Sequence, residues 1–292
     1  MKLPPFEYRR PATLEEAIAI LSASEGARPI AGGQSLIPIL AFRLAAPSVL
    51  VDLRDIPGLG HISIDDNGVR LGAMVRYRDI EDDRRLASAW PLLPAAVAHI
   101  AHYQIRNRGT IGGSLAHADP AAEMPGLATT GDATIEIFGA TGHRVIPASA
   151  LFTGALTTSL AANELITAIR LPPWQPRRRW AFEEFSLRRG DFAIVAIALY
   201  YDEDDAGRIV NAHVGVIGAG DRPLRLQEVE RALNGSRLNE NLIAAAAEAA
   251  SFAVDPQDDI HASAAYRKSL VGTLLERALT HAAVRGEHAH HA

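Results

Sequence analysis

The sequence predicts an α+β protein with a two-lobed first domain, followed by a smaller C-terminal domain in which an antiparallel sheet packs on helices. Three observations lead to this fold class. Short apolar runs alternate with helical patterns in the first part of the chain, a proline-rich segment interrupts this pattern at Pro172–Pro176, and three long strands followed by three helices complete the chain. The expected boundaries are lobe one at about 1–57 and lobe two at about 58–175, which together form the first domain at 1–175, the C-terminal domain at 177–285, and a tail at 286–292.

Lobe one begins with a helix. Thr13 and Glu16 have the spacing of a capping box, and apolar residues recur at helical spacing after them. A strand, a short helix and a buried strand follow, which together give a small βαβ-like unit. The expected elements are a strand at 28–31, a helix at 36–44 and a strand at 49–53.

Lobe two is predicted from a hairpin signal and a set of β-branched runs. The turn Asp65-Asp66-Asn67-Gly68 separates two apolar segments, which is typical of a tight hairpin. Helical patterns follow this hairpin, and three further strands complete the lobe. The expected elements are strands at 62–64, 69–74, 134–138, 143–146 and 164–171, and helices at 77–86 and 91–101.

The C-terminal domain is predicted as strands followed by helices. An alanine-rich run at 244–250 and apolar residues at helical spacing after Tyr266 fit helices that pack on a sheet. The expected elements are strands at 180–185, 194–201 and 209–217, and helices at about 225–234, 239–252 and 263–284.

One glycine pattern in this domain imitates a dinucleotide-binding motif. Gly215, Gly218 and Gly220 follow an apolar strand, but Pro223 occupies the third glycine position of the G-x-G-x-x-G pattern. The preceding pattern is also that of a hairpin. We therefore interpret the stretch as part of the sheet and expect no Rossmann unit there.

The chain is organised around Thr110–Glu123, which we interpret as a phosphate-binding loop that leads into a helix. Consecutive glycines at Gly112 and Gly113 allow positive φ angles and bring backbone N–H groups close to an anion. Asp119 followed by Pro120 is a helix-start signal, with the aspartate as N-cap. We expect a helix that begins at Pro120 and ends near residue 129.

A second stretch, Pro29–Leu36, repeats this pattern. It too has an apolar run, two glycines, a small polar residue and a leucine. Two such motifs suggest one extended ligand with two phosphates, although each alone is typical of an ordinary turn.

A charged loop at Ser186–Ala193 is the third candidate. Basic residues, including Arg188, precede a Gly-Asp pair that ends at Asp191. Taken alone, this pattern is typical of a surface loop between two core segments.

The composition excludes several function classes. A net charge of −5 gives no general electrostatic reason to bind nucleic acid, and the absence of cysteine excludes disulfides and thiolate nucleophiles in this chain.

No catalytic triad, paired-carboxylate or metal-ligand spacing is evident, so we predict no catalytic side chain and no metal site. The C-terminal His-Ala-His-His-Ala has a metal-binding composition but is interpreted as a frayed tail. Without a signal-like or transmembrane run, a cytoplasmic protein is expected.

The two glycine motifs together resemble the FAD-binding loops of the medium subunit of molybdenum hydroxylases, the family that contains carbon monoxide dehydrogenase and xanthine dehydrogenase. The resemblance extends from Pro5 to about Arg277. It implies an FAD-binding domain of the PCMH/vanillyl-alcohol-oxidase-like type and a non-covalently bound FAD.

The resemblance also implies roles for particular residues. Glu123 corresponds to an acidic residue that hydrogen-bonds a cofactor hydroxyl, and Arg188 and Asp191 correspond to a loop near the flavin ring. A lysine that some relatives carry before this loop is replaced by Glu183-Glu184, which changes the expected charge near the ring. The implied cofactor-binding residues are Ala31, Gly32, Gly33, Gln34, Ser35, Leu36, Thr110, Ile111, Gly112, Gly113, Ser114, His117, Asp119, Glu123, Arg188 and Asp191.

The implied partners are a large subunit with a molybdopterin cofactor and a small subunit with two [2Fe-2S] clusters, in a heterotrimer. Because this chain has no cysteine, a cysteine-ligated cluster must lie on another polypeptide. The implied role is to pass electrons from these clusters through FAD to an external acceptor.

Two alternatives stay open at this stage. The chain could be a free-standing flavoprotein oxidoreductase that uses NAD(P)H directly, although no substrate-binding groups or proton donor for that reaction are evident. It could also be an assembly subunit that has kept the fold and lost the cofactor, although such a subunit has no need for two unobstructed glycine motifs.

Overall fold

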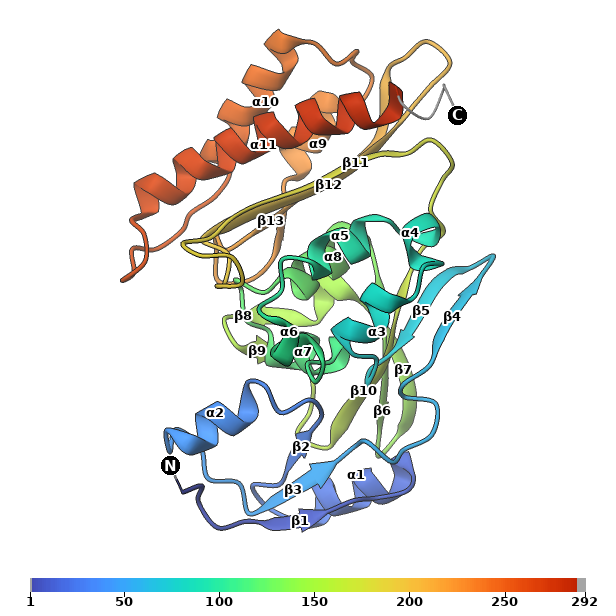
Figure 1. Cartoon of the computed structure of the whole chain (residues 1–292), viewed down its shortest axis with the longest axis vertical. Helices are drawn as coiled ribbons and strands as arrows, with labels where there is room; N and C mark the ends of the chain where they lie inside the picture. The colour runs from blue at the N-terminus through green and yellow to red at the C-terminus, as the bar shows by residue number, and fades with distance from the viewer. Residues whose placement is uncertain (1, 288–292) are drawn as a thin grey trace.

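The computed structural model describes residues 2–287. Three tiers follow one another along the long axis of the molecule, with lobe one at the bottom of Figure 1, lobe two in the middle and the C-terminal domain at the top. The mixture of helices and mainly antiparallel sheets confirms the predicted α+β class. None of the helices within the described residues combines the length and apolar character that a bilayer crossing requires.

Lobe one is a three-stranded parallel sheet in the order β1-β3-β2. The predicted helix start is confirmed, because the Thr13 hydroxyl accepts a hydrogen bond from the Glu16 N–H at 3.1 Å. The Glu16 carboxylate reaches back to the N–H of Ala12 at 2.8 Å rather than to that of Thr13. Strand β1, which is exposed, was not predicted. The elements are β1 (Glu7–Arg9), α1 (Leu14–Ala23), β2 (Arg28–Ile30), α2 (Leu36–Ala41) and β3 (Val49–Asp52).

Lobe two is built on an antiparallel sheet in the order β4-β5-β10-β6-β7. The predicted hairpin is confirmed: Gly68 has a φ of +106°, and the Asp65 carboxylate accepts from the Asn67 N–H at 2.8 Å. The strands are β4 (Ile62–Asp65), β5 (Gly68–Gly72), β6 (Thr134–Gly139), β7 (Gly142–Pro147) and β10 (Glu164–Leu171).

Short helices pack on the sheet of lobe two. The helix expected at 77–86 is broken near Asp83, whose carboxylate accepts from the Arg85 N–H at 3.1 Å and so favours a turn there. The helix expected at 91–101 ends early, at Val97. The elements are α3 (Tyr77–Asp82), α4 (Leu86–Ala89), α5 (Leu92–Val97), α6 (Tyr103–Arg106), α7 (Ile111–His117), α8 (Glu123–Thr130), the 3-10 helix η1 (Ala148–Ala150) and the small hairpin β8 (Phe152–Gly154) and β9 (Thr157–Thr158).

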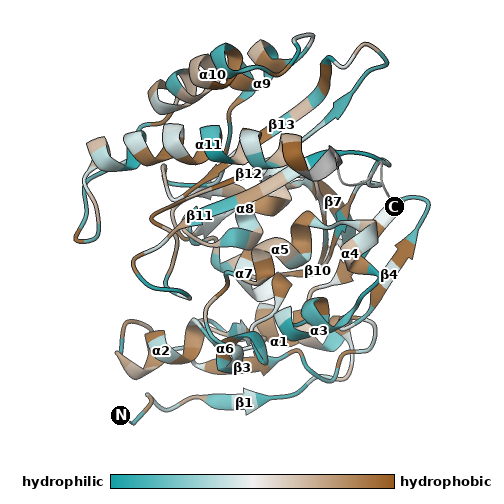
Figure 2. Cartoon of the chain, turned by 45° about the horizontal axis from the view of Figure 1, so that its top comes forward, coloured by the Kyte–Doolittle hydropathy of each residue, from teal (hydrophilic) through white to brown (hydrophobic). Residues whose placement is uncertain are grey.

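The C-terminal domain is an antiparallel sheet, β11-β12-β13-β14, whose two faces have different neighbours. One face packs on α10 and α11, and the other packs on lobe two (Figure 1). Figure 2 shows the resulting contrast in hydropathy: α5, between the sheets, is mainly hydrophobic, whereas the exposed β1 is hydrophilic. The elements are β11 (Arg179–Phe185), β12 (Val195–Glu203), β13 (Ile209–Ile217), β14 (Leu224–Arg225), α9 (Gln227–Leu233), α10 (Glu240–Phe252) and α11 (Ala264–Glu287).

Two predictions about this domain have different outcomes. Strand β13 lies between β12 and β14 in antiparallel register, which confirms that the glycine-rich stretch after it does not open a Rossmann unit. The expected tail at 286–292 is wrong for its first two residues, because α11 continues to Glu287. Its histidine cluster lies outside the described residues.

An aromatic cluster joins lobe two to the C-terminal domain. The rings of Trp90 and Trp174 have centroids 5.1 Å apart, and those of Trp174 and Tyr200 are 5.4 Å apart. The Arg178 guanidinium lies 4.4 Å from the Tyr200 centroid and donates two hydrogen bonds to Asp202. This packing fixes the sheet of the C-terminal domain against lobe two.

Candidate functional site

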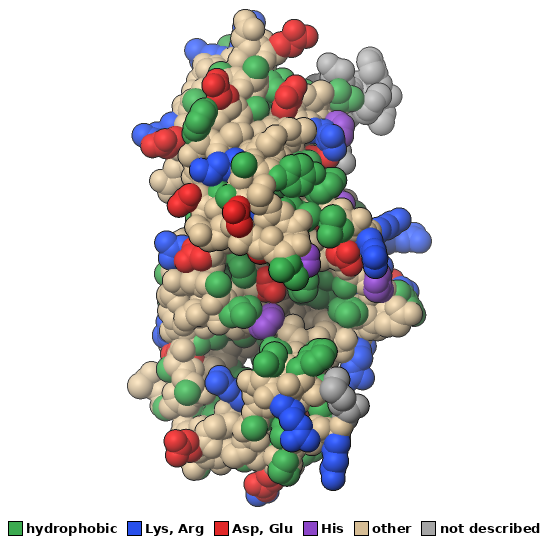
Figure 3. Space-filling model, turned by 90° about the vertical axis from the view of Figure 1, so that its left-hand side faces the viewer, with side chains coloured by type: hydrophobic (Ala, Val, Ile, Leu, Met, Phe, Trp, Pro, Cys, Tyr) green, Lys and Arg blue, Asp and Glu red, His purple; other side chains and the backbone are tan. Residues whose placement is uncertain are grey.

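A cleft of ≈ 1810 Å³ is lined by residues of both lobes and of the C-terminal domain. Figure 3 shows it as a hollow across one face of the molecule, with hydrophobic side chains along its rims. Small-molecule pockets are usually about 300–1,000 Å³, so this cleft has room for an extended ligand. All the candidate residues named from the sequence line it except Ile111 and Arg188.

The first glycine motif forms the loop between β2 and α2. Gly33 has a φ of +73°, which confirms the expected left-handed turn, and the Gln34 amide donates to the Gly32 carbonyl at 3.0 Å. Within the described part of the chain, the backbone N–H groups of Gly32 to Ser35 have no hydrogen-bond acceptor. This loop therefore offers four backbone donors to a ligand in the cleft.

The second glycine motif is not a loop, which corrects the prediction. Gly112 and Gly113 lie in the first turn of helix α7, and neither has a positive φ. Thr110 is the N-cap, and its hydroxyl accepts from the Gly113 N–H at 3.2 Å. A Cβ at Gly112 would lie 2.5 Å from the Ala73 Cβ, so this glycine allows close packing on lobe two rather than an unusual backbone angle.

The expectation that this segment offers its N–H groups to a phosphate is also wrong for Ile111 to Ser114. The N–H of Ile111 donates to the Val75 carbonyl at 3.0 Å, and that of Gly112 to the Ala73 carbonyl at 2.9 Å. The Ser114 N–H donates to the Thr110 carbonyl at 3.1 Å. Thr110, Gly112, Gly113 and Ser114 nevertheless all line the cleft.

The two motifs meet at one point of the cleft. A Cβ at Gly32 would lie 2.1 Å from the Arg108 carbonyl oxygen, two residues before Thr110. A Cβ at Gly113 would lie 3.7 Å from the Ala31 Cβ. The chain thus approaches itself closely at both glycine pairs, and both motifs face the same ligand space.

The helix predicted to begin at Pro120 begins instead at Glu123, with Ala122 as N-cap. The Asp119 carboxylate accepts from the Ala121 N–H at 2.9 Å and so stabilises a turn, and the Pro120 carbonyl accepts from the Gly218 N–H at 3.0 Å. Because this carbonyl is bonded to the end of β13, it is not available to a helix. Asp119 caps the turn and lines the cleft.

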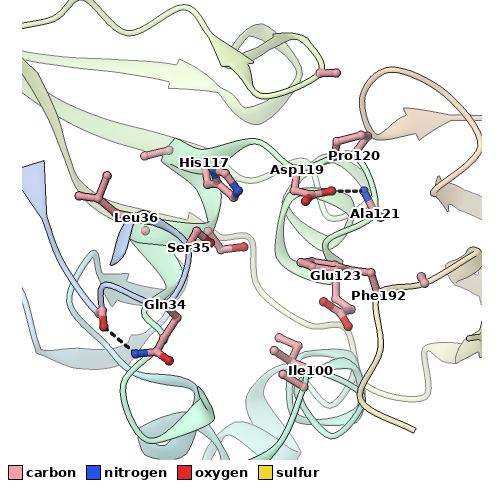
Figure 4. Close-up of a pocket in the computed structure, with 18 of the residues that line it drawn as sticks. Gln34, Ser35, Leu36, Ile100, His117, Asp119, Pro120, Ala121, Glu123 and Phe192 are labelled. Carbon is pink, nitrogen blue, oxygen red and sulfur yellow. Dashed lines mark hydrogen bonds between the residues drawn. The ribbon is translucent and has the colours of Figure 1, made fainter. Parts of the chain in front are cut away.

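Glu123 lies at the cleft wall and is 4% exposed. Burial, followed by the negative charge of the neighbouring Glu184, raises the pKa of its carboxyl to about 8. In Figure 4 the Glu123 side chain points into the open space beside Ile100 and Phe192, opposite Gln34 and Ser35. Tyr77, buried nearby, also has a raised pKa because of burial.

The two candidate residues of the loop at 186–193 differ in their position relative to the cleft. Asp191 lines the cleft, whereas Arg188 does not; the Arg188 carbonyl accepts from the Asp191 N–H at 3.0 Å and shapes the loop. Ile111 is likewise outside the lining, because its side chain is 1% exposed and belongs to the core.

Sequence reasoning missed two parts of the lining. Leu187 and Phe192, about 60% exposed, extend over the cleft from the loop at 186–193. Arg267 reaches the cleft from α11 and donates to the carbonyls of Ile194 and Gly218. A lone arginine within a helical pattern gives no signal of this role.

Comparisons with known proteins identify the family to which this architecture belongs. Residues 4–174 match the family described as the FAD binding domain in molybdopterin dehydrogenase, and residues 180–282 match the CO dehydrogenase flavoprotein C-terminal domain. The chain belongs to the FAD-binding medium subunits of the molybdenum hydroxylase family. The matches confirm the resemblance inferred from the glycine motifs.

The chain and its relatives match over nearly the whole length of both sequences. The chain is 42% identical to the nicotine 6-hydroxylase medium subunit of Paenarthrobacter nicotinovorans, over 98% of this chain and 100% of that protein. It is 36% identical to the carbon monoxide dehydrogenase medium chain of Afipia carboxidovorans, over 97% and 98% of the two chains. Among solved structures, quinoline 2-oxidoreductase from Pseudomonas putida 86 superposes with a TM-score of 0.93 at 40% identity, over 98% of this chain and 99% of that one.

The cleft of this medium subunit fits FAD. The bare N–H groups at Gly32 to Ser35 suit a diphosphate, since backbone donors without an internal partner bind an anion readily. The apolar side chains of Leu36, Ile39 and Ile100 suit flat aromatic rings at either side of it. When bound, FAD supplies the ability to accept electrons singly and to release them in pairs.

Proposed function

We propose that this chain binds one FAD non-covalently in the cleft and transfers electrons within a molybdenum-containing hydroxylase complex. The observation that carries the proposal is the meeting of the two glycine motifs at one cleft, with unpartnered N–H groups at Gly32 to Ser35. An assembly subunit without a cofactor has no need to keep four backbone donors unobstructed along a cleft.

Different residues of the cleft contact different parts of the proposed cofactor. Gly32 to Ser35 donate backbone N–H groups to the diphosphate, and the hydroxyls of Thr110 and Ser114 complete this site. Glu123 faces a cofactor hydroxyl, and Asp191 lies beside the ring. Ile111 and Arg188 act indirectly, through packing and loop shape. The proposed cofactor site is Ala31, Gly32, Gly33, Gln34, Ser35, Leu36, Thr110, Gly112, Gly113, Ser114, His117, Asp119, Glu123 and Asp191, with Ile111 and Arg188 in support.

The partners follow from the chemistry that this chain lacks. We propose that a small subunit with [2Fe-2S] clusters supplies the electrons and that a large subunit with molybdopterin generates them from the substrate. Because the chain has no cysteine, it cannot ligate such clusters with its own thiolates. The electrons leave to an external acceptor, in the cytoplasm, from a heterotrimer. The division into a cofactor domain at 1–175 and a C-terminal domain at 177–285 belongs to this proposal.

Anaerobic mixing tests the electron path. The FAD-loaded chain is combined with the small subunit whose clusters have been reduced with dithionite and freed from excess reductant. We expect the flavin absorption to bleach as the cluster absorption returns. Flavin that stays oxidised in the presence of the bound, reduced small subunit would contradict the proposal, and bleaching of the isolated chain by NADH or NADPH would favour a free-standing reductase.

A further inference from the structure

Helix α8 forms the wall of the cleft that carries Glu123, and the whole helix is buried. All of its residues, Glu123–Thr130, are covered by the rest of the chain. Asp119 and Pro120 belong to the turn before the helix and lie on the same side of the cleft as Glu123 (Figure 4). The position of these cleft residues therefore depends on what holds α8.

Strand β13 of the C-terminal domain packs directly on α8, because each partner contributes a glycine to the contact. A Cβ at Gly126 of α8 would lie 2.2 Å from the Cγ1 atom of Ile217. A Cβ at Gly215 of β13 would lie 1.7 Å from the hydroxyl oxygen of Thr130. Neither position can hold a larger residue unless the helix and the strand separate or their side chains move.

Hydrogen bonds connect β13 and the residue after it to both ends of this helix. Before the first turn of α8, the Gly218 N–H donates to the Pro120 carbonyl at 3.0 Å. At the last residue of α8, the carbonyl oxygen of Thr130 lies 2.9 Å from Nδ1 of His213. The strand thus contacts the helix at its beginning, in its middle and at its end.

The two faces of β13 contact different parts of the molecule. Side chains alternate along a strand, and Val214 and Val216 belong to the core shared with α10 and α11. Ile217 belongs to the core of lobe two instead. His213, Gly215 and Ile217 therefore form the face toward α8, and a substitution at Val216 acts on the opposite face of the same strand.

This contact also explains two glycines of the pattern that imitates a dinucleotide-binding motif. Gly215 leaves room for the Thr130 side chain. Gly218 has a φ of +78°, which favours glycine, and its carbonyl accepts from Arg267 at 2.8 Å while its N–H is bonded to Pro120. These glycines fit the C-terminal domain against the cleft wall and do not form a nucleotide-binding loop of their own.

We propose that β13 of the C-terminal domain positions one wall of the cofactor cleft: it holds α8 through Gly126, Gly215 and Ile217, and thereby sets where Glu123 and Asp119 meet the dinucleotide. This inference rests on the proposed function, in which that dinucleotide is FAD. The three contact residues are positioning residues, because none of them lines the cleft and each reaches the cofactor only through α8. The cofactor domain alone would lack this support.

The variant Gly126→Ala in the full chain tests the proposal. Alanine is a better helix former than glycine, so the change does not weaken α8 itself, and its methyl pushes the helix away from Ile217. We expect the Kd for FAD, measured by fluorescence titration, to rise about 2- to 13-fold, the effect of one hydrogen bond lost through misplacement.

Val216→Ala is the matched control on the same strand. It removes packing on the face toward α10 and α11, so its melting temperature should fall while its Kd for FAD stays unchanged at a temperature where the chain is folded. A merely structural role of the β13 contact would instead make the two variants alike, with no separate effect of Gly126→Ala on binding.

The double variant Gly126→Ala/Ile217→Ala tests whether the contact itself is the cause. It removes the Cγ1 and Cδ1 atoms of Ile217 and leaves the Cβ at that position 3.6 Å from the added methyl, an ordinary contact. We expect its Kd to return to within about twofold of that of the unaltered chain. Should Gly126→Ala alone fail to fold, Ile217→Ala replaces it as the reference, and adding the methyl at Gly126 should lower the Kd of that chain.

Hydrogen exchange measures the hold on α8 without a cofactor. The amides of residues 119–131 should exchange faster in Gly126→Ala than in the unaltered chain, while those of β10 in the same lobe keep their rates. In Val216→Ala the two segments should not separate in this way.

The outcomes separate this proposal from the proposed function. A folded Gly126→Ala chain with the Kd and the exchange rates of the unaltered chain overturns it, and so does a Val216→Ala chain whose Kd rises as much. A double variant that binds FAD no better than Ile217→Ala overturns it as well. If FAD binds neither to the unaltered chain nor to its complex with the partner subunits, the proposed function fails, and hydrogen exchange alone decides whether β13 positions α8.

Discussion

Replacing Gly32 by alanine should weaken FAD binding because the two glycine motifs meet at this residue. The added methyl would lie 2.1 Å from the Arg108 carbonyl oxygen and 2.8 Å from its carbonyl carbon, both backbone atoms that cannot rotate away. Restoring even a 3.0 Å contact requires the segments to separate by about 0.9 Å. Overpacking of this kind costs about 1–3 kcal/mol of stability.

The separation also moves the donors of the Gly32–Ser35 loop relative to the opposite wall. Losing one charge-assisted hydrogen bond to the diphosphate costs about 1.5–3 kcal/mol, which corresponds to roughly a 10- to 150-fold increase in Kd. The assay is the quenching of FAD fluorescence on titration with protein, beside a thermal unfolding curve. Gly60→Ala is the control, because nothing lies within 4 Å of a Cβ at that position. A folded Gly32→Ala chain that binds FAD as tightly as the unaltered chain would refute this reasoning.

Three further predictions concern polar side chains that are largely buried. Arg178→Ala should lower the free energy of unfolding by about 3 kcal/mol in urea titrations, because it removes a guanidinium that is 5% exposed and leaves Asp202 without its ion pair; a loss below about 1 kcal/mol would contradict this. Arg267→Met should cost about 2–3 kcal/mol, since it leaves the Gly218 carbonyl, now bonded at 2.8 Å, without a donor; an unchanged urea midpoint would show that the bond contributes nothing. His213 has a pKa lowered by burial and then by Arg225, so folding favours its neutral form. The unfolded state therefore binds the proton first, and stability should be constant above about pH 6.5 and fall below it. Melting temperatures across this range should fall less in His213→Gln, and parallel curves would argue against the assignment.

Local signals in the sequence were enough to place most helices and strands. The Thr13 cap, the Asp65–Gly68 turn and the positive φ of Gly33 all depend on neighbours within a few residues, and all are confirmed. The fold class and family followed from these elements and from the paired glycine motifs. The short strands β1, β8, β9 and β14 gave no comparable signal, because tertiary pairing rather than propensity defines such short segments.

The errors near the site come from contacts between distant parts of the chain. Gly112 is helical because Ala73 lies against it, and the helix start moves to Glu123 because the Pro120 carbonyl is bonded to Gly218. No spacing within residues 110–123 reveals either contact. The raised pKa of Glu123 depends on its burial in the fold and on the charge of Glu184, 61 residues later, so the sequence could place Glu123 in the cleft but could not give its pKa.

The flavin content of the purified chain tests the central claim most directly. The chain is incubated with excess FAD, freed from unbound cofactor and denatured by heat, and the released flavin is identified and counted against protein. The account predicts non-covalent FAD at about one per chain, with the loss of bound flavin in Gly32→Ala and its retention in Gly60→Ala. Absence of flavin both from the chain alone and from the complex co-expressed with its partner subunits would contradict it.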